Sequence, residues 1–385
     1  MKIINRIISL LVGAIFIFSG LIKLNDPMGM QIKLEEYFEV FATDQELYLS
    51  ALSGFWEFLI PYSLTIAVFL SVFEVALGVN LLLQYRTRST LWSLFLMIIF
   101  FTFLTFYSAY FNKVTDCGCF GDAIKLTPWQ SFSKDIILLL LISVMFFQRQ
   151  PFPNERTGWI KWGLSIAATI GSFVLAYYAI QHLPPLDFRP YKIGASIPDN
   201  MKPSEELRYG PEQYVYTNLE TRKDEKYNQE EYLKVFQKLS DTTKYKYKEF
   251  TKPLLNPEAQ AKITDFSVFD AEGNNLTEEI FKGDKLLIII SEIERTNPSS
   301  IPGIDNLSRQ LEKTKVKPLV LTAEAKEKFE SFRHTYQFAV QHVYFVDKTV
   351  LKTMIRSNPG LIWISNGVVR NKWHYNDLPT IKDFE

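Results

Sequence analysis

The chain has 385 residues, 47% of them hydrophobic, and its 42 basic residues balance 42 acidic residues. A chain of this length usually forms more than one domain. Because no sustained basic stripe accompanies the zero net charge, we exclude nucleic acid as a partner. Nearly all charge-free segments lie before about residue 186, so the sequence divides into an apolar half and a polar half.

Five segments before residue 187 approach the length that a helix needs to cross a membrane, about 20 mostly apolar residues. They cover residues 7–22, 58–85, 89–111, 126–148 and 162–186. The first segment follows Lys2 and Arg6 as a signal peptide would, but no small-x-small cleavage pattern comes after it. We therefore expect all five helices to be retained, with membrane lipid around them.

The basic residues of the connecting loops alternate along the chain. They precede the first segment, separate the second from the third and separate the fourth from the fifth: Lys2, Arg6, Arg86, Arg88, Arg149, Arg156 and Lys161. The loop at residues 23–57 differs, because it holds two lysines against seven acids. Short cytoplasmic loops are enriched in Lys and Arg. We therefore expect a multi-pass protein of the bacterial inner membrane, with a cytoplasmic N-terminus and a periplasmic C-terminal domain after Leu186.

The acidic loop at residues 23–57 contains its own helical pattern. Leu34, Tyr37, Phe38 and Phe41 recur at helical spacing. A helix lying on the membrane surface fits this pattern. We favour packing across the top of the bundle over a gate for a ligand.

After Pro184-Pro185 and a linker rich in helix breakers, the pattern becomes that of an α/β region. Two strands at 213–218 and 245–250 flank a helix at 230–239. Beyond residue 263, the expected strands are 266–270, 286–291, 317–322, 343–346, 361–365 and 368–373, with helices at 304–313 and 324–336. Asn366-Gly367 between the last two strands predicts a type I′ hairpin turn.

This order of elements resembles a thioredoxin-like fold over about residues 263–384. In that family a Cys-x-x-Cys follows the first long core strand, and a cis-proline precedes the terminal hairpin. Pro359 occupies the proline position, but residues 292–297 contain no cysteine. The resemblance therefore implies a degenerate thioredoxin-like domain that binds something and performs no thiol chemistry of its own.

The two cysteines of the chain, Cys117 and Cys119, are separated by Gly118 in a loop between the third and fourth segments. On the oxidising side of a membrane they can close into a very small ring, because glycine tolerates the sharp turn. Strained, exposed disulfides exchange readily. A disulfide that only fixes the loop remains the alternative. We expect no metal site, because the four histidines lie far away in sequence without chelating spacing.

The membrane half, about residues 7–148, resembles the DoxX-like and MauE-like bacterial membrane proteins. Residues 18–27 are similar to their first-helix signature, residues 74–78 to the acid-and-glycine pattern of their second helix, and residues 117–121 to the MauE cysteine motif. MauE-like proteins are associated with methylamine utilisation, in which a disulfide-rich periplasmic enzyme matures beside a thioredoxin-like partner. DoxX-like relatives are tied to quinone or sulfur redox chemistry. The resemblance therefore implies a redox role and leaves quinone as a candidate cofactor.

Ionisable groups inside a membrane are costly and often functional. Glu74 is the one charged residue of the second segment, and Lys23 is its natural partner at a cofactor site. An equal alternative is that Glu74 is hydrogen-bonded by hydroxyl groups or lies at the cytoplasmic interface near Arg86. We expect Lys134 and Asp135 to form a snorkelling pair at the outer end of the fourth segment. The glycines at 13, 20, 78 and 163 indicate close helix packing.

We therefore expect a membrane α-helical bundle of DoxX/MauE-like type, about four core helices plus a fifth transmembrane helix, followed by an α/β thioredoxin-like soluble domain. The expected domains are residues 1–150 for the bundle, 151–186 for the fifth helix, 187–262 for a linker and small α/β region, and 263–385 for the thioredoxin-like domain. The leading hypothesis is thiol–disulfide exchange through catalytic Cys117 and Cys119 with a periplasmic or envelope protein partner. The alternative is a non-enzymatic, membrane-anchored binding module with a structural disulfide.

Overall fold

The computed structural model describes residues 2–114, 118, 120–147, 158–221, 223–340 and 342–384. The chain forms two compact units. One combines Met1–Gly194 with Val268–Glu385, and the other is Ala195–Ser267. The first unit therefore contains both the membrane helices and the C-terminal sheet. In the sequence, the second unit is inserted between these two parts.

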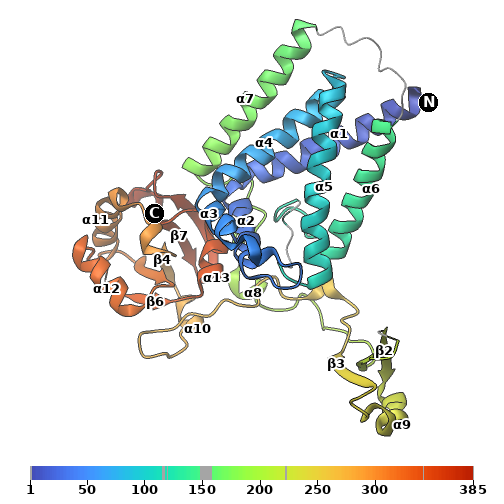
Figure 1. Ribbon diagram of the computed structural model, residues 1–385. Helices are drawn as coiled ribbons and strands as arrows, with labels where there is room; N and C mark the ends of the chain where they lie inside the picture. The colour runs from blue at the N-terminus through green and yellow to red at the C-terminus, as the bar shows by residue number, and fades with distance from the viewer. Residues whose placement is uncertain are drawn as a thin grey trace. The chain divides into compact units, whose positions relative to one another are not determined.

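Five helices among the described residues are long and apolar enough to cross a membrane, as predicted. They are Ile3–Asn25, Leu49–Leu82, Thr87–Phe111, Pro128–Phe147 and Trp159–Gln181. Within these spans lie α1 (Lys2–Asn25), α3 (Ser53–Leu59), α4 (Ser63–Leu82), α5 (Thr87–Phe111), α6 (Pro128–Phe147) and α7 (Trp159–Gln181). Figure 1 shows α1, α4, α5 and α6 grouped together. The last helix ends before Leu186, because Pro184 and Pro185 cannot continue it.

Apolar side chains fill the centre of the bundle and also cover its outside. Val12, Leu81, Leu94 and Ile142 belong to one buried cluster, whereas Leu96 and other large apolar side chains of the same helices are exposed. Apolar residues on both faces are expected when lipid replaces water outside the helices. The protein is therefore a multi-pass membrane protein.

Helix α2 (Pro27–Thr43) accounts for the helical pattern of the first loop. Leu34, Tyr37, Phe38 and Phe41 are all buried. They contact apolar side chains of α3 and its neighbours, including Trp56. The favoured packing of this helix across the end of the bundle is therefore confirmed.

The unit Ala195–Ser267 contains α8 (Ile197–Asn200) and a three-stranded antiparallel sheet in the order β2-β1-β3. Strands β1 (Gln213–Asn218) and β3 (Tyr245–Thr251) and helix α9 (Gln229–Leu239) were expected, but β2 (Lys223–Asn228) was not. The sequence of β2, KDEKYN, has no apolar alternation, and the strand forms by pairing with β1.

The C-terminal sheet has the strand order β6-β5-β4-β7-β8. Its strands are β4 (Asp284–Ile290), β5 (Lys317–Thr322), β6 (Val343–Phe345), β7 (Gly360–Ser365) and β8 (Val368–His374), and its helices are α10 (Thr277–Ile280), α11 (Ile301–Leu311), α12 (Lys326–Thr335) and α13 (Lys348–Met354). Strands β4, β5 and β6 are parallel, and β7 and β8 are antiparallel. Together with the cis Asn358-Pro359 bond before β7, this topology is consistent with the predicted thioredoxin-like domain.

Local chemistry explains where the C-terminal predictions hold and where they fail. Residues 286–290 of β4 are buried on both faces, as expected for a central strand. Asn366 and Gly367 both have positive φ, which confirms the type I′ turn. The strand expected at 266–270 is wrong. Only Phe269 pairs with a neighbouring strand, because Val268 N–H donates to the Thr277 hydroxyl instead.

Glycines on α1 and α4 allow these two helices to approach closely. A β-carbon on Gly78 would lie 2.8 Å from the carbonyl oxygen of Gly13, and one on Gly20 would lie 2.8 Å from that of Ser71. Backbone atoms cannot move aside as a flexible side chain can. Gly163 differs, because a β-carbon there meets nothing within 4 Å. The packing prediction is confirmed for Gly13, Gly20 and Gly78 and wrong for Gly163.

We therefore expect Gly78→Ala to destabilise the bundle by about 1–3 kcal/mol, the usual cost of overpacking. The measurement is thermal unfolding of the purified protein in detergent. Gly163→Ala is the matched control and should leave stability unchanged or raise it by up to about 1 kcal/mol, because alanine favours helix. Equal loss in both variants would contradict the α1–α4 contact.

Candidate functional site

Cys117 and Cys119, the predicted catalytic residues, lie outside the described residues, but Gly118 between them is described. Gly118 has a φ of +63° and Gly121 a φ of +50°. The carbonyl oxygen of Gly118 accepts a 3.2 Å hydrogen bond from Gly121 N–H. Apart from glycine, few residues other than Asn and Asp adopt this left-handed backbone conformation. The positive φ of Gly118 agrees with the sharp turn predicted for this loop.

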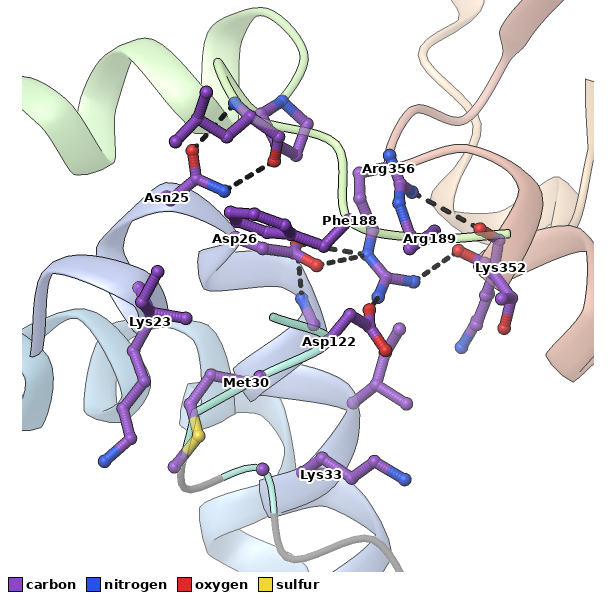
Figure 2. Close-up of a pocket in the computed structure, with 18 of the residues that line it drawn as sticks. Lys23, Asn25, Asp26, Met30, Lys33, Asp122, Phe188, Arg189, Lys352 and Arg356 are labelled. Atoms are coloured by element: carbon purple, nitrogen blue, oxygen red, sulfur yellow. Dashed lines mark hydrogen bonds and ion pairs between the residues drawn. The ribbon is translucent and has the colours of Figure 1, made fainter. Parts of the chain in front are cut away.

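A cavity of about 120 Å³ adjoins this loop at the end of the bundle where α1 finishes and α6 begins. We call it the loop pocket. Its walls come from α1, α2, the loop, the linker after α7, and α13 of the C-terminal domain. They include Lys23, Asp26, Lys33, Gly118, Asp122, Arg189, Lys352 and Arg356. The pocket therefore joins the cysteine loop to the thioredoxin-like domain (Figure 2).

Arg356 makes polar contacts with three other residues of the loop pocket. Its Nε lies 3.0 and 2.9 Å from the two carboxylate oxygens of Asp26, and its Nη2 lies 3.5 Å from Asp122 Oδ2. Its Nη1 donates to the carbonyl oxygen of Lys352. Figure 2 shows the guanidinium between the two aspartates. Arg356 is only 8% exposed, so this charge is buried and paired.

Asp26 also holds the start of α2. Its Oδ1 accepts a 2.9 Å hydrogen bond from Gly29 N–H, which makes it the N-cap. Burial by itself raises the pKa of Asp26, but the charges of Arg356 and Arg189 and the Gly29 bond outweigh it and hold the pKa below its ordinary value. Asp26 is therefore a carboxylate at neutral pH.

The predicted partners Lys23 and Glu74 form an ion pair inside the bundle. Lys23 is 6% exposed and Glu74 is 1% exposed. The alternatives, hydroxyl groups or Arg86, are wrong. The two residues meet because α4 begins at Ser63, so Glu74 lies only eleven residues into the helix. The preceding α3 is a separate helix.

A second ion pair lies beside the first. Lys134 Nζ is 3.0 Å from Asp135 Oδ1, and the Thr105 hydroxyl donates to Asp135 Oδ2 over 2.9 Å. Asp135 is 1% exposed. The predicted snorkelling pair is therefore wrong for Asp135, whose carboxylate is buried inside the bundle. Lys134 lies 4.9 Å from the ring centre of Phe120, the residue after Cys119.

Lys23, Glu74, Lys134 and Asp135 all line a small cavity of about 20 Å³. We call it the core cavity. Lys23 also lines the loop pocket, so it lies between the two. Glu74 Oε2 has no hydrogen-bond partner among the described residues. A cavity of this size holds about one water molecule.

The core cavity does not fit the candidate cofactor, quinone. Cavities that bind a benzene-sized ring are on the order of 150 Å³, whereas the space beside Glu74 is about 20 Å³. Lys23 and Glu74 neutralise each other there. Lys23 and Glu74 therefore do not form a quinone site.

Sequence reasoning missed Asp26, Asp122 and Arg356 as members of one site. Asp26 and Asp122 occur within or directly after the motifs that resemble MauE-like proteins, which was the available signal. Arg356 is 330 residues from Asp26. No local pattern reports a contact over that separation.

Comparison with known proteins supports the membrane half of this description. Residues 1–148 match the family model described as methylamine utilisation protein MauE. The chain is also 28% identical over 174 residues to protein TlpB of Flavobacterium psychrophilum, which covers 44% of this chain and 43% of the relative. The chain thus matches less than half the length of this curated relative. The predicted resemblance to MauE-like proteins is confirmed.

The buried ion pair leads to a stability prediction. Glu74→Gln keeps the shape of the side chain but leaves the Lys23 charge unpaired, so we expect a loss of about 3–5 kcal/mol. The double variant Lys23→Met with Glu74→Gln should recover much of that loss. Thermal unfolding in detergent measures both.

Glu57→Gln is the matched control, because Glu57 is exposed on α3 in the same span. It should change stability by less than about 0.5 kcal/mol. If Glu74→Gln behaved like this control, the pair would have no role in holding the bundle together.

Proposed function

We propose that this chain is a thiol–disulfide component of the bacterial cell envelope, in which Cys117 and Cys119 exchange electrons with a partner protein. The observation that carries the proposal is the position of the cysteine motif. It lies inside the segment that matches the MauE family, and Gly118 lines a pocket at the end of the bundle. A partner can reach a loop in that position without entering the membrane.

The exchange proceeds through a mixed disulfide. In one direction, a cysteine thiolate of the reduced loop attacks the disulfide of the partner and displaces one partner thiolate. The second cysteine of the loop then attacks the mixed disulfide and releases the other partner thiolate. Two electrons pass to the partner, which becomes a dithiol, and the loop becomes a disulfide. The reverse sequence oxidises the partner.

Positive charge favours the thiolate, which is the reactive form, and two cations beside the described part of the loop, Lys33 and Arg356, are each paired with carboxylates. A β-carbon on Gly118 would lie 3.4 Å from Lys33 Cγ, and Lys33 lines the loop pocket with Arg356. We assign Glu74 and Lys23 a supporting role beneath the loop, as the paired charges that keep this end of the bundle in one arrangement.

The competing function is a membrane-anchored binding module with a structural disulfide. The two functions make opposite forecasts for cysteine variants. For exchange, Cys119→Ser should leave Cys117 able to trap a partner, because no resolving thiol remains. The mixed disulfide should be visible by non-reducing gels and mass spectrometry of envelope fractions.

The double variant Cys117→Ser with Cys119→Ser is the control and should trap nothing. A structural disulfide predicts instead that both single variants lose stability similarly and that neither accumulates an adduct. Absence of any adduct, together with resistance of the native pair to mild reductant, would replace the exchange function with the binding module.

We also propose that the N-terminus is cytoplasmic and the C-terminal domain periplasmic. Arg86 and Arg88 support this orientation, because they lie at the start of α5, whereas the cysteine loop follows its end. Alkaline phosphatase fused after Leu186 should be active, and green fluorescent protein fused there should not fluoresce. The matched fusions after Arg88 should give the reverse pattern. Fluorescence after Leu186 would invert the topology.

A further inference from the structure

One contact between the C-terminal domain and the bundle lies in the segment that precedes the cis-proline. Arg356 lies between α13 and the Asn358-Pro359 bond. Its two carboxylate partners belong to different parts of the bundle. Asp26 joins α1 to α2, and Asp122 lies three residues after Cys119. One guanidinium thus connects the domain, the helix ends and the cysteine loop.

The Arg356–Asp26 contact is shorter than the Arg356–Asp122 contact, and we assign the two contacts different roles. The contact with Asp26 is short: one Nε–H of Arg356 is shared between the two carboxylate oxygens, at 3.0 and 2.9 Å, and this charge-assisted bond helps to dock the domain. The Asp122 contact is longer, at 3.5 Å, and Asp122 is not needed for docking through Asp26. Loss of the Asp122 contact would therefore affect mainly the loop to which Asp122 belongs.

A second ion pair crosses the same interface without involving the loop. Arg295 Nη1 lies 3.0 Å from Glu35 Oε1 on α2. The Arg295 side chain is 46% exposed, so this pair contributes little to stability. It provides a matched control for any variant that weakens the interface in general.

We propose that Arg356 is a positioning residue for the cysteine loop: through Asp122 it holds the segment that follows Cys119, so that docking of the thioredoxin-like domain fixes the geometry of the exchange site. This inference rests on the proposed function for its effect on exchange. Positioning of the loop through Arg356 would be a role for the degenerate domain that requires no cysteine in that domain. Preorganisation of this kind matters because small displacements of a reacting group slow a reaction strongly.

The test uses the full-length protein in detergent and measures the order of the loop directly. In Asp122→Asn, hydrogen exchange of the amides at residues 120–124 should accelerate about tenfold, because the anchored carboxylate is lost. Arg356→Gln should accelerate the same amides at least as much. In the double variant the effects should not add, since both remove one contact. Arg295→Gln should leave these amides within about twofold of the wild type.

The same variants are then placed in the Cys119→Ser background, and the yield of partner adduct is measured. We expect Asp122→Asn to lower the yield about tenfold and Arg295→Gln to leave it unchanged. Asp122→Asn keeps the Arg356–Asp26 contact, so the test survives if Arg356→Gln fails to fold.

The outcomes separate the two proposals. If Asp122→Asn and Arg295→Gln change loop exchange equally, or neither changes it, Arg356 does not position the loop. Amide exchange of the loop can accelerate in Asp122→Asn while Cys119→Ser alone yields no adduct. In that case the exchange function fails and the positioning contact stands. Additive effects in the double variant would show that Asp122 acts through another group, which also overturns the inference.

Discussion

A buried guanidinium group must be paired, because taking an isolated charge out of water costs several kcal/mol. Arg356 meets this constraint with two carboxylates, Asp26 and Asp122. Asp26 in turn caps α2. The neighbouring Asn25 exchanges two hydrogen bonds, of 2.8 and 2.9 Å, with the backbone of Leu186 in the linker after α7. The entry of α2, the course of the linker and one contact of the C-terminal domain with the bundle therefore share one set of polar groups around the loop pocket.

The same constraint acts more strongly inside the membrane, where no water compensates a charge. The bundle meets it with two adjacent ion pairs, Lys23 with Glu74 and Lys134 with Asp135. Both pairs border the core cavity, and Lys23 borders the loop pocket as well. Paired charges thus continue from the docked domain into the end of the bundle at which α1 finishes and α6 begins.

How far the sequence predicts this arrangement depends on whether the signal is local. Five apolar stretches predicted the membrane helices, and the Asn366-Gly367 pair predicted a turn, because length and backbone preference act within one segment. Strand β2 was missed because its pairing partner β1, rather than its own residues, makes it a strand. Asp135 was misplaced because composition does not tell which way a side chain points. Arg356 could not be found at all, since its partners lie more than 200 residues away.

Ion pairs occupy the stretch after β4, where the resemblance to a thioredoxin-like fold leads to the expectation of a Cys-x-x-Cys. Glu292 follows the central strand β4, and its carboxylate lies 3.0 Å from Lys348 Nζ and 2.5 Å from Lys352 Nζ. Burial raises the pKa of Glu292, but these lysines outweigh it and hold the pKa below its ordinary value. Both lysines belong to α13, whose end leads directly into Arg356. Glu292 therefore fastens α13 to the end of β4, and the segment after α13 presents the guanidinium that reaches the bundle. Through these contacts a domain without cysteines reaches Asp122, the residue on which the positioning proposal rests.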